Sequence, residues 1–571
     1  MPVMRLRFLL LPTLVIGTHA FAQSALSTDP YHYTIQKEVT VQHGAVVSAH
    51  PLASQAGARI LQQGGNAVDA AITTQLALAV VYPAAGNLGG GGFLVGHLSD
   101  GKDISIDYRE MAPAKAHRDM YLDASGNANT TLSQEGHLAA GVPGTVAGIF
   151  ASLPYAKLPL RKLIQPAITL AEKGFAITEK EANSLNGQAA VFKRLNTKPT
   201  RFVKNTPWKA GDTLIQPELA GTLKRIRDKG MEGFYGGETA AMIVEEMQRG
   251  KGIITATDLK AYKAKERKPI VFNYKDYTLI TMPLPSSGGI VLQQMMGMVE
   301  KYPLSTWGFH SPQAIQLMVE AERRAYADRA EYLGDADFVK VPVKQLTDKK
   351  YLEQRMADYV SNKAGTSVAT KAGTPLHESE QTTHLSVMDD QGNAISVTTT
   401  LNGGYGSKVV VGGAGFFLNN EMDDFSVKPG VPNMYGLVGN EANAIAPGKR
   451  MLSSMTPTIV LQRRRPYLVV GTPGGSTIMT SVFQTLINIL EFNMPVAKAV
   501  NETKFHHQWL PDQVDVEPDF PAGIISSLEQ MGYKVTPRRN TIGRTEVIRV
   551  NNKGMLEAVG DIRGDDSAAG Y

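Results

Sequence analysis

The chain has 571 residues, a formal net charge of +5 at pH 7 and no cysteine. The lack of cysteine excludes disulfides, thiolate nucleophiles and thiolate metal sites, and the near balance of charges gives no indication of a nucleic-acid partner. The length would ordinarily suggest more than one domain, but neither a Pro/Ser-rich linker nor an internal repeat divides the chain.

Residues 1–22 have the pattern of a secretory signal peptide. Arg5 and Arg7 form a basic start, an apolar run covers residues 8–16, and Ala20-Phe21-Ala22 is a small-x-small cleavage site. We therefore predict an exported protein, periplasmic or secreted, with a formal charge of +3 once the two arginines are lost; a retained signal anchor is the alternative. The apolar run is too short to span a bilayer, and no later run is long enough, so we expect no membrane span after signal removal.

The first part of the chain, up to the region of residue 370, is predicted to be mostly helical with a few strands. Apolar residues at helical spacing, together with caps and breakers, predict the helices, whereas short β-rich runs predict the strands. Ser311-Pro312 starts one helix and Gly334 stops it. The other predicted helices cover residues 54–61, 67–81 and 238–247, and the strands cover residues 45–48, 93–97, 104–108 and 277–282.

Residues 382–402 are predicted to form a β-hairpin. Two β-rich runs flank turn residues 389–393, and a turn centred on Gln391 places Leu385 opposite Val397 and Val387 opposite Ile395 on one apolar face. In the same register Thr382 lies opposite Thr400, with Cβ atoms about 5 Å apart. One hydroxyl beside another at a strand end suits a threonine nucleophile, and a threonine at a chain N-terminus can use its own amine as the base.

Further on, strands are predicted at residues 458–462 and 467–471, joined by a basic hairpin turn at residues 463–466. Gly474-Gly475 then precedes a predicted helix at residues 477–490. Glycines between a strand and a helix let backbone N–H groups approach a substrate oxygen, which indicates an oxyanion hole. A tight packing turn or a phosphate site would give the same pattern, so these alternatives stay open.

Several ordered motifs between residue 41 and the C-terminus closely resemble the γ-glutamyltranspeptidases, members of the N-terminal nucleophile hydrolases. The resemblance implies a four-layer αββα sandwich of α/β (α+β) class, and self-cleavage between Gln381 and Thr382. It also implies a large subunit of residues 23–381 and a small subunit of residues 382–571, paired as a heterodimer without a cofactor or metal. The motifs are Gln381-Thr382-Thr383-His384, Asp107-Tyr108-Arg109-Glu110, Thr398-Thr399-Thr400-Leu401-Asn402, Asn419-Asn420-Glu421-Met422-Asp423-Asp424, Leu452-Ser453-Ser454-Met455, Pro473-Gly474-Gly475-Ser476 and Phe505-His506-His507-Gln508-Trp509.

The resemblance also implies a role for each site residue. Thr382 is the nucleophile, Thr400 its hydrogen-bond partner, and Gly474-Gly475 the oxyanion hole. Arg109 with Ser453 and Ser454 would bind an α-carboxylate; Asp424, helped by Glu421 and Asn402, would bind an α-ammonium; and Tyr435 would close a lid of residues 429–439. Glu421 stands where many bacterial relatives carry glutamine, and its charge beside Asp424 is expected to tighten amine binding or raise one carboxyl pKa.

The activity implied is transfer of a γ-glutamyl group from glutathione or related amides to water, amino acids or peptides through a threonine acyl-enzyme. Small molecules are thus the expected partners. A dicarboxylic-acyl acylase of the same superfamily, acting on glutaryl or cephalosporin-type substrates, is the alternative enzyme. Asp424 favours the first activity, because its charge has a purpose only when the acyl group carries an amine. A γ-glutamyl-peptide binding protein that never cleaves itself is the non-enzymatic alternative.

Overall fold

The computed structural model describes residues 29–370 and 382–571. The expected signal peptide, residues 1–22, and Gln381 of the expected cleavage junction lie outside the described residues. Within these ranges, no helix is both long and apolar enough to cross a membrane.

Two seven-stranded antiparallel sheets form the centre of the molecule. In spatial order, one sheet contains β1 (Glu38–Val41), β18 (Leu556–Val559), β17 (Glu546–Val550), β13 (Arg465–Gly471), β12 (Thr458–Gln462), β9 (Tyr277–Thr281) and β8 (Ile270–Tyr274). The other contains β19 (Ser567–Gly570), β2 (Gly44–Ser48), β10 (Thr383–Asp389), β11 (Ala394–Thr400), β3 (Gly91–His97), β4 (Asp103–Asp107) and β7 (Lys265–Arg267).

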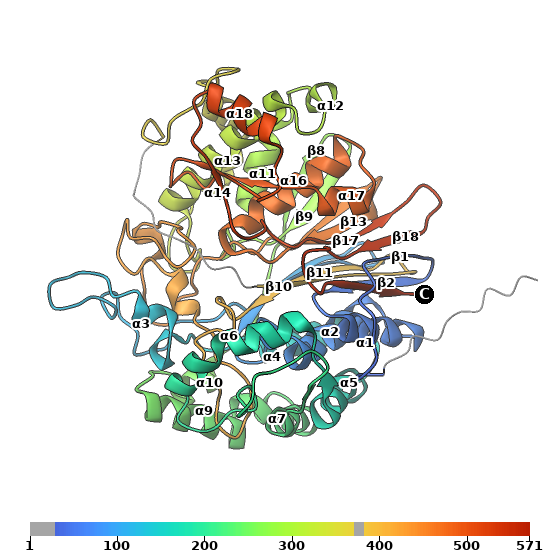
Figure 1. The fold of residues 1–571 in the computed structure, drawn as a ribbon, viewed down its shortest axis with the longest axis vertical. Coiled ribbons are helices and arrows are strands. Elements are labelled where there is room, and N and C mark those ends of the chain that lie inside the picture. The colour runs from blue at the N-terminus through green and yellow to red at the C-terminus, as the bar shows by residue number, and fades with distance from the viewer. Residues whose placement is uncertain (1–28, 371–381) are drawn as a thin grey trace, which may run out of the picture.

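The two sheets stack face to face, and helices cover both outer faces (Figure 1). A buried apolar cluster between the sheets joins Val47 and Phe93 of one to Ile459 and Ile548 of the other. Helix layers on the β10 side contain α1 (Pro51–Gln62), α2 (Ala67–Val81), α4 (Thr145–Ser152), α5 (Leu160–Lys173), α6 (Glu179–Leu195), α7 (Pro217–Lys229), α8 (Glu232–Tyr235), α9 (Gly237–Gly250) and α10 (Ala256–Ala261). The predicted αββα sandwich is therefore confirmed.

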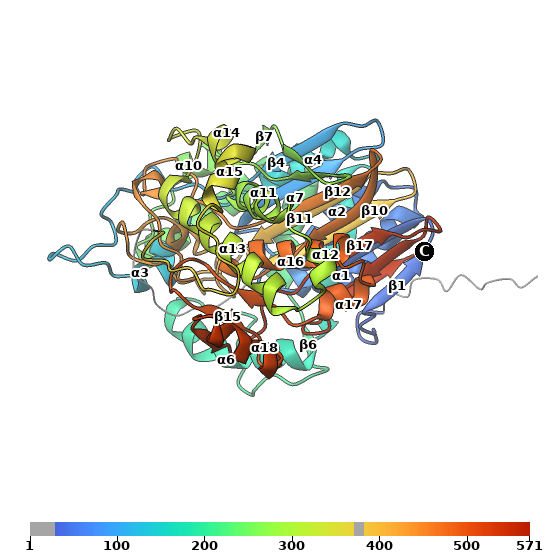
Figure 2. The ribbon, with the colours of Figure 1, turned by 90° about the horizontal axis from the view of Figure 1, so that it is seen from above.

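Helices on the opposite side pack over the β13 sheet, as the view from above shows (Figure 2). Helix α11 contacts α13, α16 and β8, while α17 contacts β17 and β18. This layer contains α11 (Gly288–Val299), α12 (Leu304–Trp307), α13 (Pro312–Tyr332), α14 (Val343–Leu346), α15 (Lys349–Arg355), α16 (Ile478–Leu490), α17 (Val496–Asn501) and α18 (Ala522–Gln530). The remaining elements are short: α3 (Thr131–Gln134), β5 (Phe175–Ala176), β6 (Thr213–Leu214), β14 (Phe505–His506), β15 (Val514–Val516), β16 (Val535–Pro537), and the 3₁₀ turns η1 (His137–Ala139), η2 (Leu153–Tyr155), η3 (Glu421–Asp424), η4 (Glu441–Asn443) and η5 (Gly475–Thr477).

The β10–β11 hairpin has the predicted register, with Leu385 opposite Val397 and Val387 opposite Ile395. Its apolar face belongs to the core shared with the helices on that side, where α2 packs on both strands. The polar face does not meet solvent. It points at the other sheet, where Ser386 Oγ donates to the Glu546 carbonyl at 3.1 Å and Ser396 Oγ to the Val470 carbonyl at 3.2 Å. These polar side chains therefore fix the two sheets to each other.

Local sequence signals set most helix and turn boundaries. Ser311 Oγ accepts from the Ala314 N–H and caps α13, as predicted. The helix predicted at residues 477–490 begins at Ile478, after the short turn η5. The predicted basic hairpin turn is shorter than expected: Arg463 and Arg464 have φ of 51° and 64°, and β13 already starts at Arg465. Two consecutive residues with positive φ complete a tight two-residue turn, so Arg465 and Pro466 belong to the strand.

Candidate active site

The open end of the β10–β11 hairpin carries the two threonines singled out in the sequence. Thr382 immediately precedes β10 and Thr400 is the last residue of β11; their exposed fractions are 4% and 3%. Both line one cavity, as the register requires. Thr400 Oγ1 accepts a hydrogen bond from the Asn402 N–H at 2.8 Å. Thr382 and Thr400 are both among the described residues, and no hydrogen bond joins their hydroxyl groups. The predicted hydrogen bond from Thr400 to Thr382 is therefore not formed in this arrangement.

The cavity gathers every predicted site residue except Gly474. Its lining residues come from the segment after β4, the residue before β10, the end of β11 and the loop after it, the turn η3 and the loop that follows, and the segments before β12 and after β13. They are Arg109, Thr382, Thr400, Asn402, Glu421, Asp424, Tyr435, Leu437, Ser453, Ser454, Met455, Gly475 and Ile478. The space between them is only about 20 Å³, because oppositely charged side chains reach across it and pair. A ligand of any size must therefore separate those pairs.

Arg109 is the centre of this charge cluster. Its guanidinium is 1% exposed and lies 2.5 Å from Glu421 Oε2 and 3.5 Å from Glu110 Oε2, and it also donates to Asp424 Oδ2. The side chain donates further to the Met451 carbonyl at 3.3 Å. The residues expected to bind a carboxylate and an ammonium are thus paired with each other, so the cluster already contains both charges that a zwitterionic ligand would need.

Three carboxyl groups share this one arginine, and burial makes it costly for all of them to ionise. Burial raises the pKa of Glu110 to about 8, against the lowering effect of Arg109. Burial also raises the pKa of Glu421 well above its usual range, and the nearby Glu110 and Asp424 add to that effect. Burial raises the pKa of Asp424 as well, against the lowering effect of Arg109. The carboxyl whose pKa rises most clearly is therefore that of Glu421 itself, whereas its hydrogen bond lowers the pKa of Asp424. The cluster therefore holds protons that isolated carboxyl groups would have lost.

Replacing Glu421 by Gln should stabilise the folded protein more at about pH 8 than at about pH 5. The pKa of Glu421 is raised on folding, so the folded state retains the proton longer and loses stability as pH rises from the unfolded value toward the folded one. Glutamine has no such proton. We expect the Tm to rise by about 1–2 °C at the higher pH, since an unfolding entropy of roughly 2 cal/mol/K per residue gives a body of this size about 1 °C per kcal/mol.

Scanning calorimetry of the Glu421→Gln variant at both pH values checks this. Glu441→Gln is the matched control, because Glu441 is an exposed acid that pairs with the exposed Arg118. The same Tm change at both pH values would contradict the claim that Glu421 keeps its proton in the folded protein.

Ser453 and Ser454 lie on a backbone segment held by the loop before α11. The Ser287 N–H donates to the Ser453 carbonyl at 2.8 Å, and Ser453 N–H donates to the Pro285 carbonyl at 3.0 Å. Ser454 Oγ accepts from Arg329 Nη2 at 3.3 Å. Arg329 belongs to α13 and is 5% exposed, and its burial lowers its pKa to about 10. The predicted carboxylate site therefore contains a second arginine behind the two serines.

The predicted lid is in contact with the site. Tyr435 is 3% exposed and its hydroxyl donates to the Asn402 carbonyl at 2.5 Å. Asn433, from the same loop, donates from Nδ2 to Asp424 Oδ1 at 3.0 Å. Residue 475 must be glycine beneath this tyrosine: a Cβ there would lie 2.4 Å from the Tyr435 ring, and its φ is +54°. The loop thus covers the cavity and fixes the orientation of Asp424.

The glycine pair lies between two cavities that both include Thr382. Gly475 lines the small charged cavity, while Gly474 lines a second one of about 450 Å³. Gly474 has φ of +143° and precedes η5 and α16, so the turn presents backbone at a helix N-terminus, in a cavity that Thr382 also lines. This placement favours the oxyanion-hole interpretation over a phosphate site.

Three residues of the site were not found from the sequence: Glu110, Arg329 and Asn433. Glu110 follows Arg109 directly and could have been noticed as a second charge at the end of a strand. Arg329 is one of three buried arginines on α13, beside Arg323 and Arg324, so its sequence context does not distinguish it. No group of three or more His, Asp or Glu in the described ranges is placed to hold a metal ion.

Comparisons with known proteins agree with this geometry. The family model described as "Gamma-glutamyltranspeptidase" matches residues 53–571. A "Glutathione hydrolase proenzyme" from Escherichia coli K12 is 46% identical, over 99% of both chains. A cephalosporin acylase from Bacillus halodurans superimposes with a TM-score of 0.81 at 26% identity, covering 95% of this chain and 98% of that one. A Helicobacter pylori gamma-glutamyltranspeptidase chain gives 0.56 at 43% identity, covering 60% of this chain and 97% of that one.

Proposed function

The chain belongs to the γ-glutamyltranspeptidase family and is a γ-glutamyltransferase and glutathione hydrolase made as a self-cleaving proenzyme; we propose that Thr382 is the nucleophile both in its maturation and in its turnover. The observation that carries this proposal is the cavity itself. It places a threonine at a strand terminus beside a glycine turn and between charged groups of both signs. A γ-glutamyl group carries an α-carboxylate, an α-ammonium and a carbonyl, and each of these finds a counterpart there.

In maturation, the Thr382 hydroxyl oxygen attacks the Gln381 carbonyl carbon. The peptide C–N bond breaks, the Thr382 nitrogen takes a proton and becomes a free amine, and Gln381 is left as an ester on Thr382 Oγ1. Water then hydrolyses the ester, which releases a C-terminal carboxylate on Gln381 and regenerates the hydroxyl. The products are residues up to Gln381 and residues from Thr382 onward. The free α-amine has an ordinary pKa near ~8, so it can act as a base at neutral pH.

In turnover, the amine of Thr382 accepts the hydroxyl proton while the oxygen attacks the donor's γ-carbonyl carbon. Backbone N–H groups at Gly474 and Gly475 stabilise the oxyanion that develops. The amine then passes the proton to the departing nitrogen, the C–N bond breaks, and the γ-glutamyl ester of Thr382 remains. Water or the amine of an acceptor attacks this ester by the reverse sequence. The buried position of Thr382 and the overlying lid restrict the access of water.

Donor recognition follows from an exchange of ion pairs. The α-carboxylate of the donor takes the place of Asp424 on Arg109, with Ser453 and Ser454 as hydroxyl donors, and the α-ammonium takes the place of Arg109 on Asp424. Both protein charges keep a partner throughout, so neither is left buried alone. Asn433 holds the other Asp424 oxygen and thus keeps the carboxylate in place during the exchange. Glu421 and Asn402 complete the ammonium side.

The acylase alternative rests on the fold likeness to the cephalosporin acylase. One experiment distinguishes the two functions: the rates of hydrolysis of γ-glutamyl anilide and glutaryl anilide are compared. The two compounds differ only in the α-amine, which glutaryl anilide lacks. We expect kcat/KM for the γ-glutamyl compound to exceed that for glutaryl by about 10³-fold or more, because glutaryl leaves Asp424 buried without its cation. Equal values would favour the acylase. The identity to hydrolase proenzymes gives no support to a purely binding role.

The proposed subunits, residues 23–381 and 382–571, would remain one folded body after cleavage. Strands β10 and β11 of the second piece pair with β2 and β3 of the first, and β12 pairs with β9. Both sheets therefore contain strands from both pieces, which supports a permanent heterodimer. Export through the signal in residues 1–22 is also part of the proposal, with the periplasm or the medium as destination.

A further inference from the structure

Thr382 borders two cavities of different character, so a donor whose amide bond is cleaved at Thr382 has space on both sides of that bond. The small charged one contains Arg109 and Asp424. The second, of about 450 Å³, is lined by Thr382, Pro473, Gly474 and Gly543, by Tyr82 and Arg544, and by the segment Arg539, Asn540 and Thr541. In the function proposed above, the γ-glutamyl group of the donor occupies the first cavity. The amine that departs from its γ-carbonyl carbon then extends from Thr382 into the second cavity.

The second cavity is basic. Among the described residues that line it, two are arginines and none is acidic. Arg539 is exposed and makes no ion pair within the described part of the chain. Arg544 is different, because its guanidinium has a fixed position. Its Nη2 donates to the Tyr82 hydroxyl at 2.8 Å, and its Nη1 lies 3.5 Å from Asp566 Oδ2.

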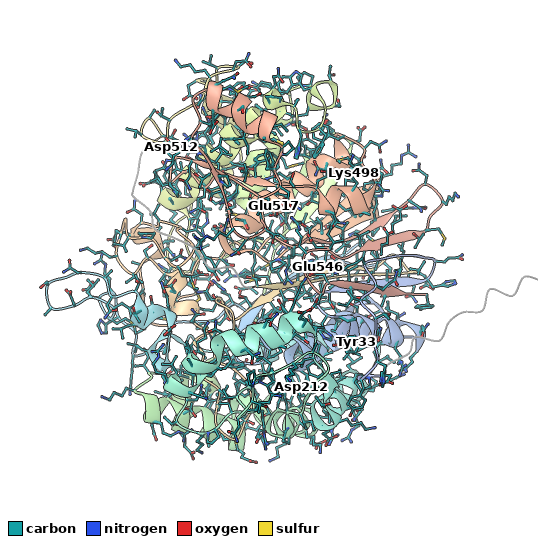
Figure 3. All side chains as sticks on the ribbon, in the orientation of Figure 1. Tyr33, Asp212, Lys498, Asp512, Glu517 and Glu546 are labelled. Atoms are coloured by element: carbon teal, nitrogen blue, oxygen red, sulfur yellow. The ribbon has the colours of Figure 1, made fainter. Side chains whose placement is uncertain are left out.

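Arg544 is anchored from the interior of the molecule and still reaches the cavity. Asp566 has no side-chain exposure, and neither has Glu546, which follows two residues after Arg544 and is labelled near the centre of Figure 3. The Arg544 side chain itself keeps 20% exposure. One side of the guanidinium is thus held by the buried Asp566 and by the Tyr82 hydroxyl, while the rest remains open to a ligand. A guanidinium fixed in this way is suited to a carboxylate, because little side-chain freedom remains to be lost on binding.

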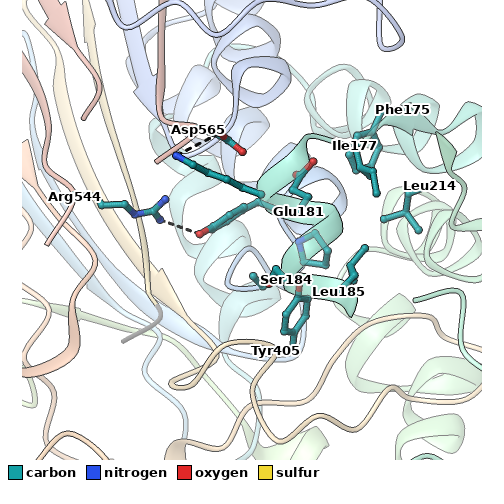
Figure 4. A pocket seen from close by; sticks show the side chains of 13 residues that line it. Phe175, Ile177, Glu181, Ser184, Leu185, Leu214, Tyr405, Arg544 and Asp565 are labelled. Carbon is teal, nitrogen blue, oxygen red and sulfur yellow. Dashed lines mark hydrogen bonds and ion pairs between the residues drawn. The ribbon is translucent and has the colours of Figure 1, made fainter. Parts of the chain in front are cut away.

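A neighbouring pocket shares Tyr82 and Arg544 with the second cavity. Its volume is about 180 Å³, and its lining combines apolar residues such as Phe175 and Leu214 with Lys180, Glu181 and Asp565 (Figure 4). Lys180 Nζ lies 3.9 Å from Asp565 Oδ1, and burial raises the pKa of Glu181 to about 8. Thr382 lines the second cavity and not this pocket, so a substrate anion that binds Arg544 during the reaction is expected in the second cavity.

We propose that Arg544 binds the carboxylate of the leaving peptide and of the acceptor amino acid or peptide, so that the Thr382–Arg544 cavity is the leaving-group and acceptor site. The inference rests on the proposed function of Thr382. It assigns one contact for the substrates named above: Arg544 binds the carboxylate of the peptide part of glutathione as it departs, and the free carboxyl end of an acceptor. Donors with an uncharged leaving group use only the first cavity.

The test is the ratio of kcat/KM for glutathione to kcat/KM for γ-glutamyl anilide, whose leaving group has no carboxylate. In the Arg544→Gln variant we expect this ratio to fall about 10- to 100-fold, the effect of losing one hydrogen-bonded charge contact. Arg464→Gln, in the exposed turn between β12 and β13 and outside both cavities, is the matched control and should change the ratio less than about threefold. A ratio for Arg544→Gln within twofold of the unmodified enzyme would overturn the proposal.

A second measurement covers the case in which Arg544→Gln fails to mature. The unmodified enzyme is given glycylglycine or its C-terminal amide as acceptor, and the acceptor KM is compared; we expect the amide to bind about 10-fold or more worse. Equal KM values would contradict a carboxylate site. Failure of the unmodified enzyme to hydrolyse γ-glutamyl anilide would instead contradict the proposed function, which keeps the two claims separate.

Discussion

The Thr382→Ala variant is expected to remain a single uncut chain and to lose γ-glutamyl anilide hydrolysis by about 10⁴-fold or more, because removal of a nucleophile abolishes the covalent route. Alanine retains the strand geometry, so the cavity between Arg109 and Gly475 should persist. Gel electrophoresis under denaturing conditions shows whether the chain is cut, and a chromogenic γ-glutamyl anilide measures turnover. Thr382→Ser keeps both the hydroxyl and the future amine, and should mature and turn over, more slowly.

The neighbouring threonine provides the control. Thr383 is fully buried, and its hydroxyl has no hydrogen-bond partner in the described part of the chain. Thr383→Val keeps its shape and should leave both cleavage and hydrolysis within about threefold of the unmodified protein, as expected when no interaction is removed. If Thr382→Ala matured and hydrolysed the anilide at the unmodified rate, the nucleophile would have to be another residue.

Replacing Arg109 by Lys should lower kcat/KM for γ-glutamyl anilide by about 10²- to 10³-fold, because an ammonium cannot bind a carboxylate bidentately. The charge is retained, so the three surrounding acids still share one cation and the protein should fold and mature. Arg109→Gln should lose as much activity and also stability, since breaking a buried pair by removing one partner costs about 3–5 kcal/mol. Steady-state kinetics and calorimetry on both variants separate the two effects.

Arg118→Lys is the surface control for this pair of variants. Arg118 is half exposed and pairs with Glu441, which is exposed in turn, so the change should alter neither kcat/KM nor Tm measurably. Unchanged kcat/KM in Arg109→Lys would mean that the donor's carboxylate is bound elsewhere; Arg329, behind Ser454, would be the next residue to change.

Local patterns predicted much of the fold because they are independent of distant contacts. Alternation alone placed Leu385 opposite Val397, and the Ser311 cap fixed the start of α13. Helix α5 shows the limit of such rules: Pro166 lies inside it, and a helix with an interior proline is stable only through tertiary packing. The polar face of β10 and β11 shows the other limit. Alternation separated this face from the apolar one but did not show that a second sheet covers it.

The site was predicted mainly from the family resemblance, and what was missed depends on long-range packing. Nothing in the sequence around Arg109 shows that Asp424 and Glu421 reach it across more than 300 residues of chain. Asn433 contacts Asp424 only because the lid folds back over the cavity. These arrangements come from the assembly of η3, the lid and β4, which no local pattern determines.

The central claim, that Thr382 becomes a chain N-terminus and the nucleophile, is tested most directly by an intact mass spectrum of the purified protein. The account predicts two polypeptides, one ending at Gln381 and the other with the mass of the segment from Thr382 to Tyr571. A single uncut chain, or a pair of fragments whose boundary lies at another residue, would contradict it.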